Sequence, residues 1–82
     1  MKVLRLLPGN DIMKCLIKFV EDNNIKAGYI LTCVGSTSDT CLRPPGKNIT
    51  IKKEGKFEIV SLVGTLCSDL NHIHMSISDE NL

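Results

Sequence analysis

Two histidines, His72 and His74, are the residues whose type and spacing most directly suggest chemistry in this sequence. They fall in a stretch, residues 72–78, in which polar and apolar residues alternate, so a strand would place both imidazoles on one face. Side chains at alternate strand positions lie about 7 Å apart, and their nitrogens can converge on one ion at about 2.1 Å. Zinc is the metal that imidazole ligands suggest first. The spacing by itself favours a simpler hypothesis, in which the histidines form only the solvent-facing side of an amphipathic strand.

Three charged residues are further candidates for a binding site. Glu58 stands inside an almost wholly apolar run, and a carboxylate there is costly unless it is paired. We therefore expect a salt bridge to Arg43 or Arg5, although Glu58 could instead act as a general base or support a histidine. Arg43 and Arg5 could also bind an anionic ligand. For Arg5, a strand residue whose charged end reaches solvent is the simpler interpretation.

Composition limits the classes of protein to which the chain can belong. Its 82 residues make one small domain with a net charge of +1. No basic run could follow a phosphate backbone, and no apolar run reaches the roughly 20 residues of a membrane span. The sequence therefore predicts no direct nucleic-acid binding and no membrane insertion.

The cysteines and the first residues indicate the compartment. Cys15, Cys33, Cys41 and Cys67 include no CxxC pair, and the start of the chain is a poor secretory signal. We expect four reduced thiols in an intracellular protein, cytoplasmic or nuclear.

The elements that must position these residues follow from the apolar pattern. Residues 12–22 repeat apolar side chains at helical spacing, and Asn10 or Asp11 can cap this helix. Strands are predicted over residues 2–7, 26–34, 40–43, 48–53, 57–63 and 72–78. We expect Glu54-Gly55 to join two of these strands as a tight hairpin, and residues 57–63 to be buried on both faces. The fold class is α+β, with one N-terminal helix and a mostly antiparallel sheet of five to six strands.

Several short motifs occur in a fixed order along the chain. They are Arg5 with Pro8-Gly9-Asn10-Asp11, then Gly35-Ser36, Leu42-Arg43, Gly55-Lys56-Phe57-Glu58-Ile59-Val60-Ser61-Leu62-Val63-Gly64-Thr65-Leu66 and His72-Ile73-His74. In this order they resemble the plants-and-prokaryotes conserved (PPC) domain over nearly all of the 82 residues. In plants that domain occurs in AT-hook nuclear proteins, and in bacteria and archaea it stands alone.

The resemblance implies a ligand set and an assembly. It implies a homotrimer in which His72 and His74 are two of three zinc ligands, the third lying in a later Gly-Gly-His motif. That motif is absent here, so we expect residues 1–82 to be a single, C-terminally truncated PPC-like domain. Cys67 or Asp69 could replace the third ligand. In the family pattern Arg43 lies near an expected pocket, which makes Arg43 and Glu58 candidates for binding a cofactor or ligand.

Three functions from different classes follow. The first is an oligomeric module that binds a metal ion or a small ligand through the histidine pair. The second is an assembly domain of a DNA-associated or transcription-regulatory protein, with nuclear proteins as partners; no Arg-Gly-Arg-Pro hook is present for direct DNA contact. The third is a metal-dependent hydrolase or lyase with Glu58 as base. It requires a complete ligand set, which the sequence does not supply.

Overall fold

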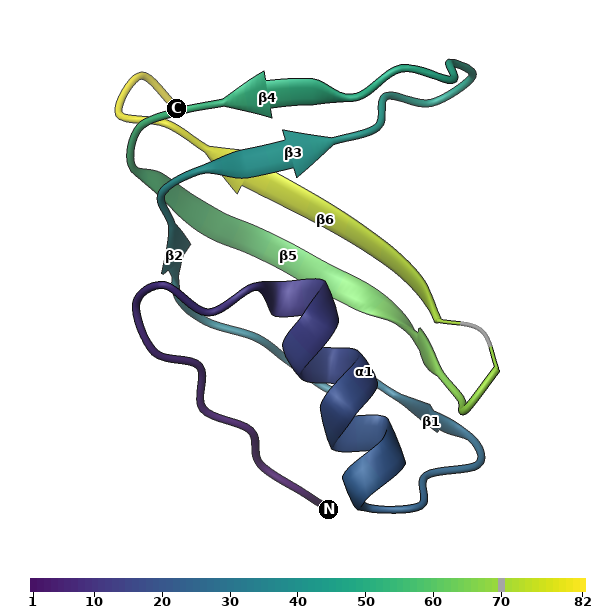
Figure 1. Ribbon diagram of the computed structural model, residues 1–82. Helices are drawn as coiled ribbons and strands as arrows, with labels where there is room; N and C mark the ends of the chain where they lie inside the picture. The colour runs from purple at the N-terminus through teal and green to yellow at the C-terminus, as the bar shows by residue number, and fades with distance from the viewer. Residues whose placement is uncertain (70) are drawn as a thin grey trace. The chain divides into compact units, whose positions relative to one another are not determined.

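The computed structural model describes residues 1–69 and 71–82, and these form one helix and six strands (Figure 1). The elements are α1 (Ile12–Asp22), β1 (Gly28–Tyr29), β2 (Ser36–Thr37), β3 (Thr40–Leu42), β4 (Ile51–Lys53), β5 (Phe57–Leu66) and β6 (His72–Ser78). Every strand pair with a described register is antiparallel. The expected α+β class with a mostly antiparallel sheet is therefore confirmed.

Helix α1 begins where the sequence predicts, because Asp11 caps it. The Asp11 Oδ1 atom accepts a hydrogen bond of 2.9 Å from the backbone N–H of Lys14, which otherwise has no partner in the first turn. Leu16 and Val20, one turn apart, are the buried residues of the helix, so its apolar stripe faces inward. The predicted bounds and the predicted inner face are both confirmed.

A change of backbone conformation at Asn24 ends the helix. Asn24 has φ of 51°, and its N–H donates to the carbonyl of Glu21 while that of Ile25 donates to the carbonyl of Val20. These two bonds form a Schellman motif, which satisfies carbonyl groups that the helix would otherwise leave open. Asparagine is one of the few residues other than glycine that adopts this conformation readily.

Strand β5 is the longest strand and pairs with three others. Its last residues pair with β1, with Gly28 opposite Leu66, and its first residues pair with β2, with Thr37 opposite Phe57. Strand β6 also pairs with β5, whereas β3 and β4 form a separate two-stranded sheet. Figure 1 shows β5 and β6 as two long neighbouring ribbons.

The chain divides into two compact units, which share β5 and β6. The first unit comprises Met1–Ile30 and Val63–Ile73, and its buried side chains are Leu16, Val20 and Leu66. The second comprises Leu31–Leu62 and His74–Leu82, with Leu62 and Thr40 buried. The Thr40 hydroxyl shares a hydrogen bond of 2.9 Å with the Thr37 hydroxyl, which compensates for its burial.

Three of the predicted strands differ in the structure. Residues 1–7 form no strand, and Val3 and Leu7 are exposed, because no described strand lies beside them to complete a ladder. The strand predicted over residues 26–34 shortens to β1, which pairs with one end of β5, whereas β2 lies beyond that range and pairs with the other end of β5. The prediction that residues 57–63 are buried on both faces is wrong, since Val60 and Val63 are 63% and 57% exposed.

The hairpin predicted at Glu54-Gly55 is also wrong. Strand β4 pairs with β3, with Leu42 opposite Ile51, rather than with β5. Gly55 between β4 and β5 has φ of 140°, a conformation open to glycine and strained for other residues. The chain therefore passes from one sheet to the other at this glycine.

Candidate functional site

The two histidines lie on β6 as the alternating sequence predicts. His72, His74 and Ser76 are exposed, whereas Ile73, Met75 and Ile77 between them are partly buried. The polar and apolar faces of the strand are thus real, and both imidazoles are on the exposed one. Their joint coordination of a metal ion stays a prediction.

Gly64 of β5 leaves room for the backbone at the start of β6, which begins at His72. The backbone of His72 and Ile73 lies against Gly64 so closely that any side chain there would collide with it. A glycine within a strand often marks such an approach of a second backbone. Gly64 therefore belongs to the structural support of His72.

No third metal ligand joins the two histidines in the described part of the chain. No group of three or more histidine, cysteine, aspartate or glutamate side chains is placed to hold an ion in residues 1–69 and 71–82. Cys67 and Asp69, which could have replaced the third ligand, line a cavity on the side of α1 instead. Within the residues that the structure describes, the two imidazoles therefore stay the predicted donors.

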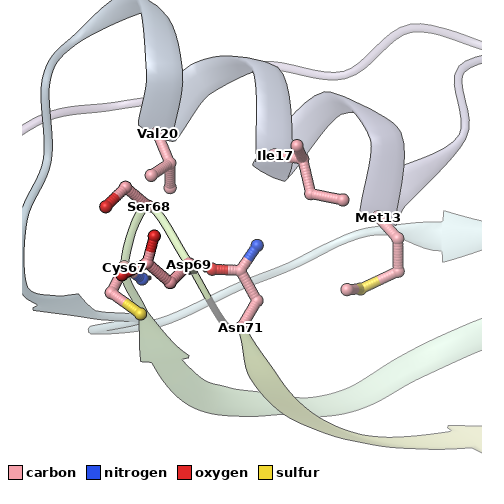
Figure 2. A pocket seen from close by; sticks show the side chains of 7 residues that line it. All are labelled: Met13, Ile17, Val20, Cys67, Ser68, Asp69 and Asn71. Carbon is pink, nitrogen blue, oxygen red and sulfur yellow. Dashed lines mark hydrogen bonds between the residues drawn. The ribbon is translucent and has the colours of Figure 1, made fainter.

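The cavity beside α1 has a volume of about 220 Å³. Seven described residues line it: Met13, Ile17, Val20, Cys67, Ser68, Asp69 and Asn71 (Figure 2). The helix supplies an apolar wall and the connection from β5 to β6 supplies a polar one. Ordinary ligand sites have volumes of about 300–1,000 Å³, so this smaller cavity admits only a small fragment of a ligand.

Asn71 shapes the polar wall of this cavity. Its side-chain oxygen accepts a hydrogen bond of 3.1 Å from the Cys67 backbone N–H, and Figure 2 shows the side chain directed towards the helix. The sequence analysis named Cys67 and Asp69 only as substitutes for a third metal ligand, and it did not name Asn71, Met13 or Ile17. A polar connection that follows a predicted strand, together with an amphipathic helix, was the signal available for them.

Arg43 and Glu58 are the remaining candidates, and Glu58 is placed differently from the prediction that it is buried. Both are exposed, and Glu58 lies on β5 opposite Ser36 of β2. Within the described residues, neither Arg43 nor Arg5 forms an ion pair with Glu58. Exposure removes the burial cost that made a partner necessary, so the salt-bridge hypothesis loses its reason. A role for Arg43 and Glu58 in ligand binding stays a prediction.

The four cysteines carry thiols and form no disulfide. Cys41 is exposed and the other three are partly buried. This agrees with the expectation of reduced cysteines.

Comparison with known proteins identifies the family. The Plants and Prokaryotes Conserved (PCC) domain, the same family as the PPC domain that the motifs resemble, matches residues 1–82. The chain belongs to the PCC domain family. Both the fold and the ordered motifs are explained by this membership.

Curated and solved relatives of this PCC domain are longer than the chain. Two proteins named "Bifunctional protein GlmU", from Synechococcus sp. strains JA-3-3Ab and JA-2-3B'a(2-13), are 37% and 34% identical over 76 residues. The match covers 93% of this chain but 12% of each relative. The solved structure of a hypothetical protein from Salmonella enterica matches with a TM-score of 0.93 and 41% identity, covering 95% of this chain and 56% of that one.

The PCC chain has no helix that is both long and apolar enough to cross a membrane, within the residues that the structure describes. Helix α1, of 11 residues, is a short amphipathic helix with a buried stripe.

Proposed function

We propose that this PCC domain is an oligomeric binding module that holds a metal ion or small ligand through His72 and His74. One observation carries the proposal: both imidazoles are exposed at alternate positions of β6, the arrangement in which two side chains of one strand point the same way. Neutral imidazole nitrogens are good ligands for Zn²⁺, so zinc is the ion we propose.

The histidine pair leaves room for further ligands. Zinc in proteins is usually four-coordinate, so two imidazoles would leave two positions for water, a small ligand or a side chain of another subunit. The function of the ion in such a site would be to fix that ligand. Glu58 and Arg43 are the charged residues that we propose could contact it, and no catalytic residue is proposed.

Assembly with further copies of the chain, as a homotrimer, is the second part of the proposal. Several large apolar side chains are mostly exposed, namely Tyr29, Leu31, Val34, Val60 and Val63. An 82-residue chain buries only a modest core, and contact with other copies would cover such side chains. Partner proteins of another kind could cover them too, which is the alternative of an assembly domain in a DNA-associated protein.

Titration with Co²⁺, a spectroscopic substitute for Zn²⁺, tests the metal site. We expect the ligand-field absorption of bound Co²⁺ to appear when the native chain is titrated. In His72→Ala and in His74→Ala, we expect the affinity for Co²⁺ to fall about tenfold or more. Ser76→Ala is the matched control, because Ser76 is exposed on the same face of β6 one strand repeat further along. We expect it to bind as the native chain does.

Equal binding by all three variants and the native chain would contradict the histidine site. A trimer that forms without metal and is unaffected by either histidine substitution would favour the assembly domain over the metal-binding module.

A further inference from the structure

The positive charge of the chain is concentrated in one exposed segment. Residues 43–53, called here the basic segment, contain Arg43, Lys47, Lys52 and Lys53 and no carboxylate. The whole chain has 10 basic and 9 acidic residues, so the remainder has 6 basic and 9 acidic residues and a net charge of −3. The overall charge of +1 hides this division.

The basic segment is almost entirely exposed. Of its 11 residues only Pro44 is partly buried, and both isoleucines reach solvent, Ile49 at 55% and Ile51 at 40% exposure. Lys52 pairs with Glu54 at 3.6 Å, and both side chains are mostly in solvent. Lysines that surround exposed isoleucines offer a partner both charge and apolar contact.

The segment also offers a strand edge. It includes β4, which in the described residues pairs only with β3, in a sheet of two strands. Figure 1 shows β3 and β4 as a two-stranded ribbon of their own. The far edge of β4 therefore presents backbone N–H and C=O groups that a further extended chain could pair with.

We infer that the basic segment is a docking surface for an extended acidic segment of a partner protein, which adds a strand to the edge of β4. Charge complementarity decides the sign of the partner's charge, because the basic segment carries four positive charges; carboxylates on one face of the added strand would lie beside Lys52, and apolar side chains on its other face beside Ile51. The alternation of side chains along β4 decides the residue pattern of the added strand, because Ile51 and Lys53 lie on one face of β4 and Lys52 lies on the other.

Two other anionic partners fit less well. A lipid surface cannot satisfy the backbone groups of a strand edge, which a peptide satisfies fully. Single-stranded nucleic acid uses aromatic side chains to stack its bases, and residues 43–53 contain none. The exposed isoleucines also favour a peptide, which can supply apolar side chains between its carboxylates.

Fluorescence anisotropy with a labelled, end-blocked peptide that alternates valine and glutamate tests the inference on the full chain. We expect saturable binding that weakens with salt, and a loss of about tenfold or more in affinity in the double variant Lys52→Glu/Lys53→Glu. Lys2→Glu, at an exposed lysine outside the segment, is the matched control and should lose little affinity for the peptide. A peptide N-methylated at alternate residues should bind more weakly, because it lacks donors for the edge of β4.

Three results would overturn the inference. One is equal binding of a peptide with lysine in place of glutamate, and another is unchanged affinity of the N-methylated peptide. The third is tighter binding of duplex DNA or of phosphatidylserine vesicles than of the acidic peptide, with the same dependence on Lys52 and Lys53. None of these results depends on His72 or His74, so failure here leaves the metal site standing.

Discussion

Gly64 of β5 lies directly against the backbone of His72, at the start of β6. A Cβ atom at position 64 would overlap the His72 carbonyl oxygen and would lie 2.9 Å from the Ile73 Cα and 2.7 Å from its Cδ1. Backbone atoms paired into a sheet cannot move aside as the end of a flexible side chain can. The first histidine of the candidate site is therefore positioned by a residue that has no side chain.

Replacing Gly64 with alanine should both destabilise the chain and displace His72. We expect Gly64→Ala to lower the free energy of unfolding by about 2–3 kcal/mol, since the methyl group must push β6 away from β5. Urea unfolding followed by circular dichroism measures this. Gly28→Ala is the matched control, because a Cβ there meets chiefly the Ile25 side chain, at 3.2 Å, and a side chain can yield. Equal stability of Gly64→Ala and the native chain would contradict the close approach.

The core of the first unit depends on Val20. Its side chain is 2% exposed, whereas Ile17 on the same helix is 44% exposed. We expect Val20→Ala to cost about 2 kcal/mol through lost burial and the cavity left behind, and Ile17→Ala to cost less than about 1 kcal/mol. Thermal unfolding of the two variants provides the comparison. The reverse order of stability would show that the helix buries another face.

The N-cap of α1 can be tested with two substitutions at one position. Asp11→Ala removes the acceptor for the Lys14 N–H and should cost about 1 kcal/mol, while Asp11→Asn keeps an acceptor and should cost little. Helical circular dichroism and urea unfolding together measure the loss. If alanine and asparagine behave alike, the hydrogen bond contributes nothing to stability.

Lys18 and Asp22 give the helix a small dependence on alkaline pH. The hydrogen bond to Asp22, together with the charge of that carboxylate, raises the pKa of Lys18 above its ordinary 10.5. A raised pKa in the folded state means that the stabilisation is complete below pH 10.5 and is lost as the pH rises through the higher folded value. Both side chains are well exposed, so the effect is small and screened by salt.

We expect the native chain to be slightly more stable than Lys18→Met at neutral pH in low salt, and the difference to vanish above the folded pKa of Lys18. Urea unfolding of both chains, at neutral pH and at a pH above the folded pKa of Lys18, measures the difference in the free energy of unfolding. A difference that persists at high pH would mean that packing of the lysine stem, rather than its charge, is responsible.

Much of the fold could be predicted from local patterns. Helix α1 and strand β6 have the predicted bounds, because each depends on a repeat of side chains within its own sequence and, for the helix, on a cap at Asp11. The two histidines were found for the same reason. Strand partners could not be predicted so well: residues 1–7 have a strand-like composition but no described neighbour, and β4 pairs with β3 across a turn rather than with β5 across Gly55.

The rest of the site depends on spatial relationships that no local pattern reports. Glu58 stands in an apolar run, yet it faces solvent because β5 buries different faces along its length. The cavity beside α1 joins Met13 and Ile17 to Asn71, which lies more than 50 residues away in the sequence. Only the packing of the helix against the connection between β5 and β6 brings these residues together.

Native mass spectrometry of the full chain, recorded with and without Zn²⁺, tests the proposed module most directly, because it reports subunit number and bound ions together. The account predicts a trimer that gains zinc ions when zinc is present, with Ser76→Ala unchanged and His72→Ala/His74→Ala losing the ions. A solitary chain without zinc at saturating metal, or a zinc-loaded species that persists in the double histidine variant, would contradict it.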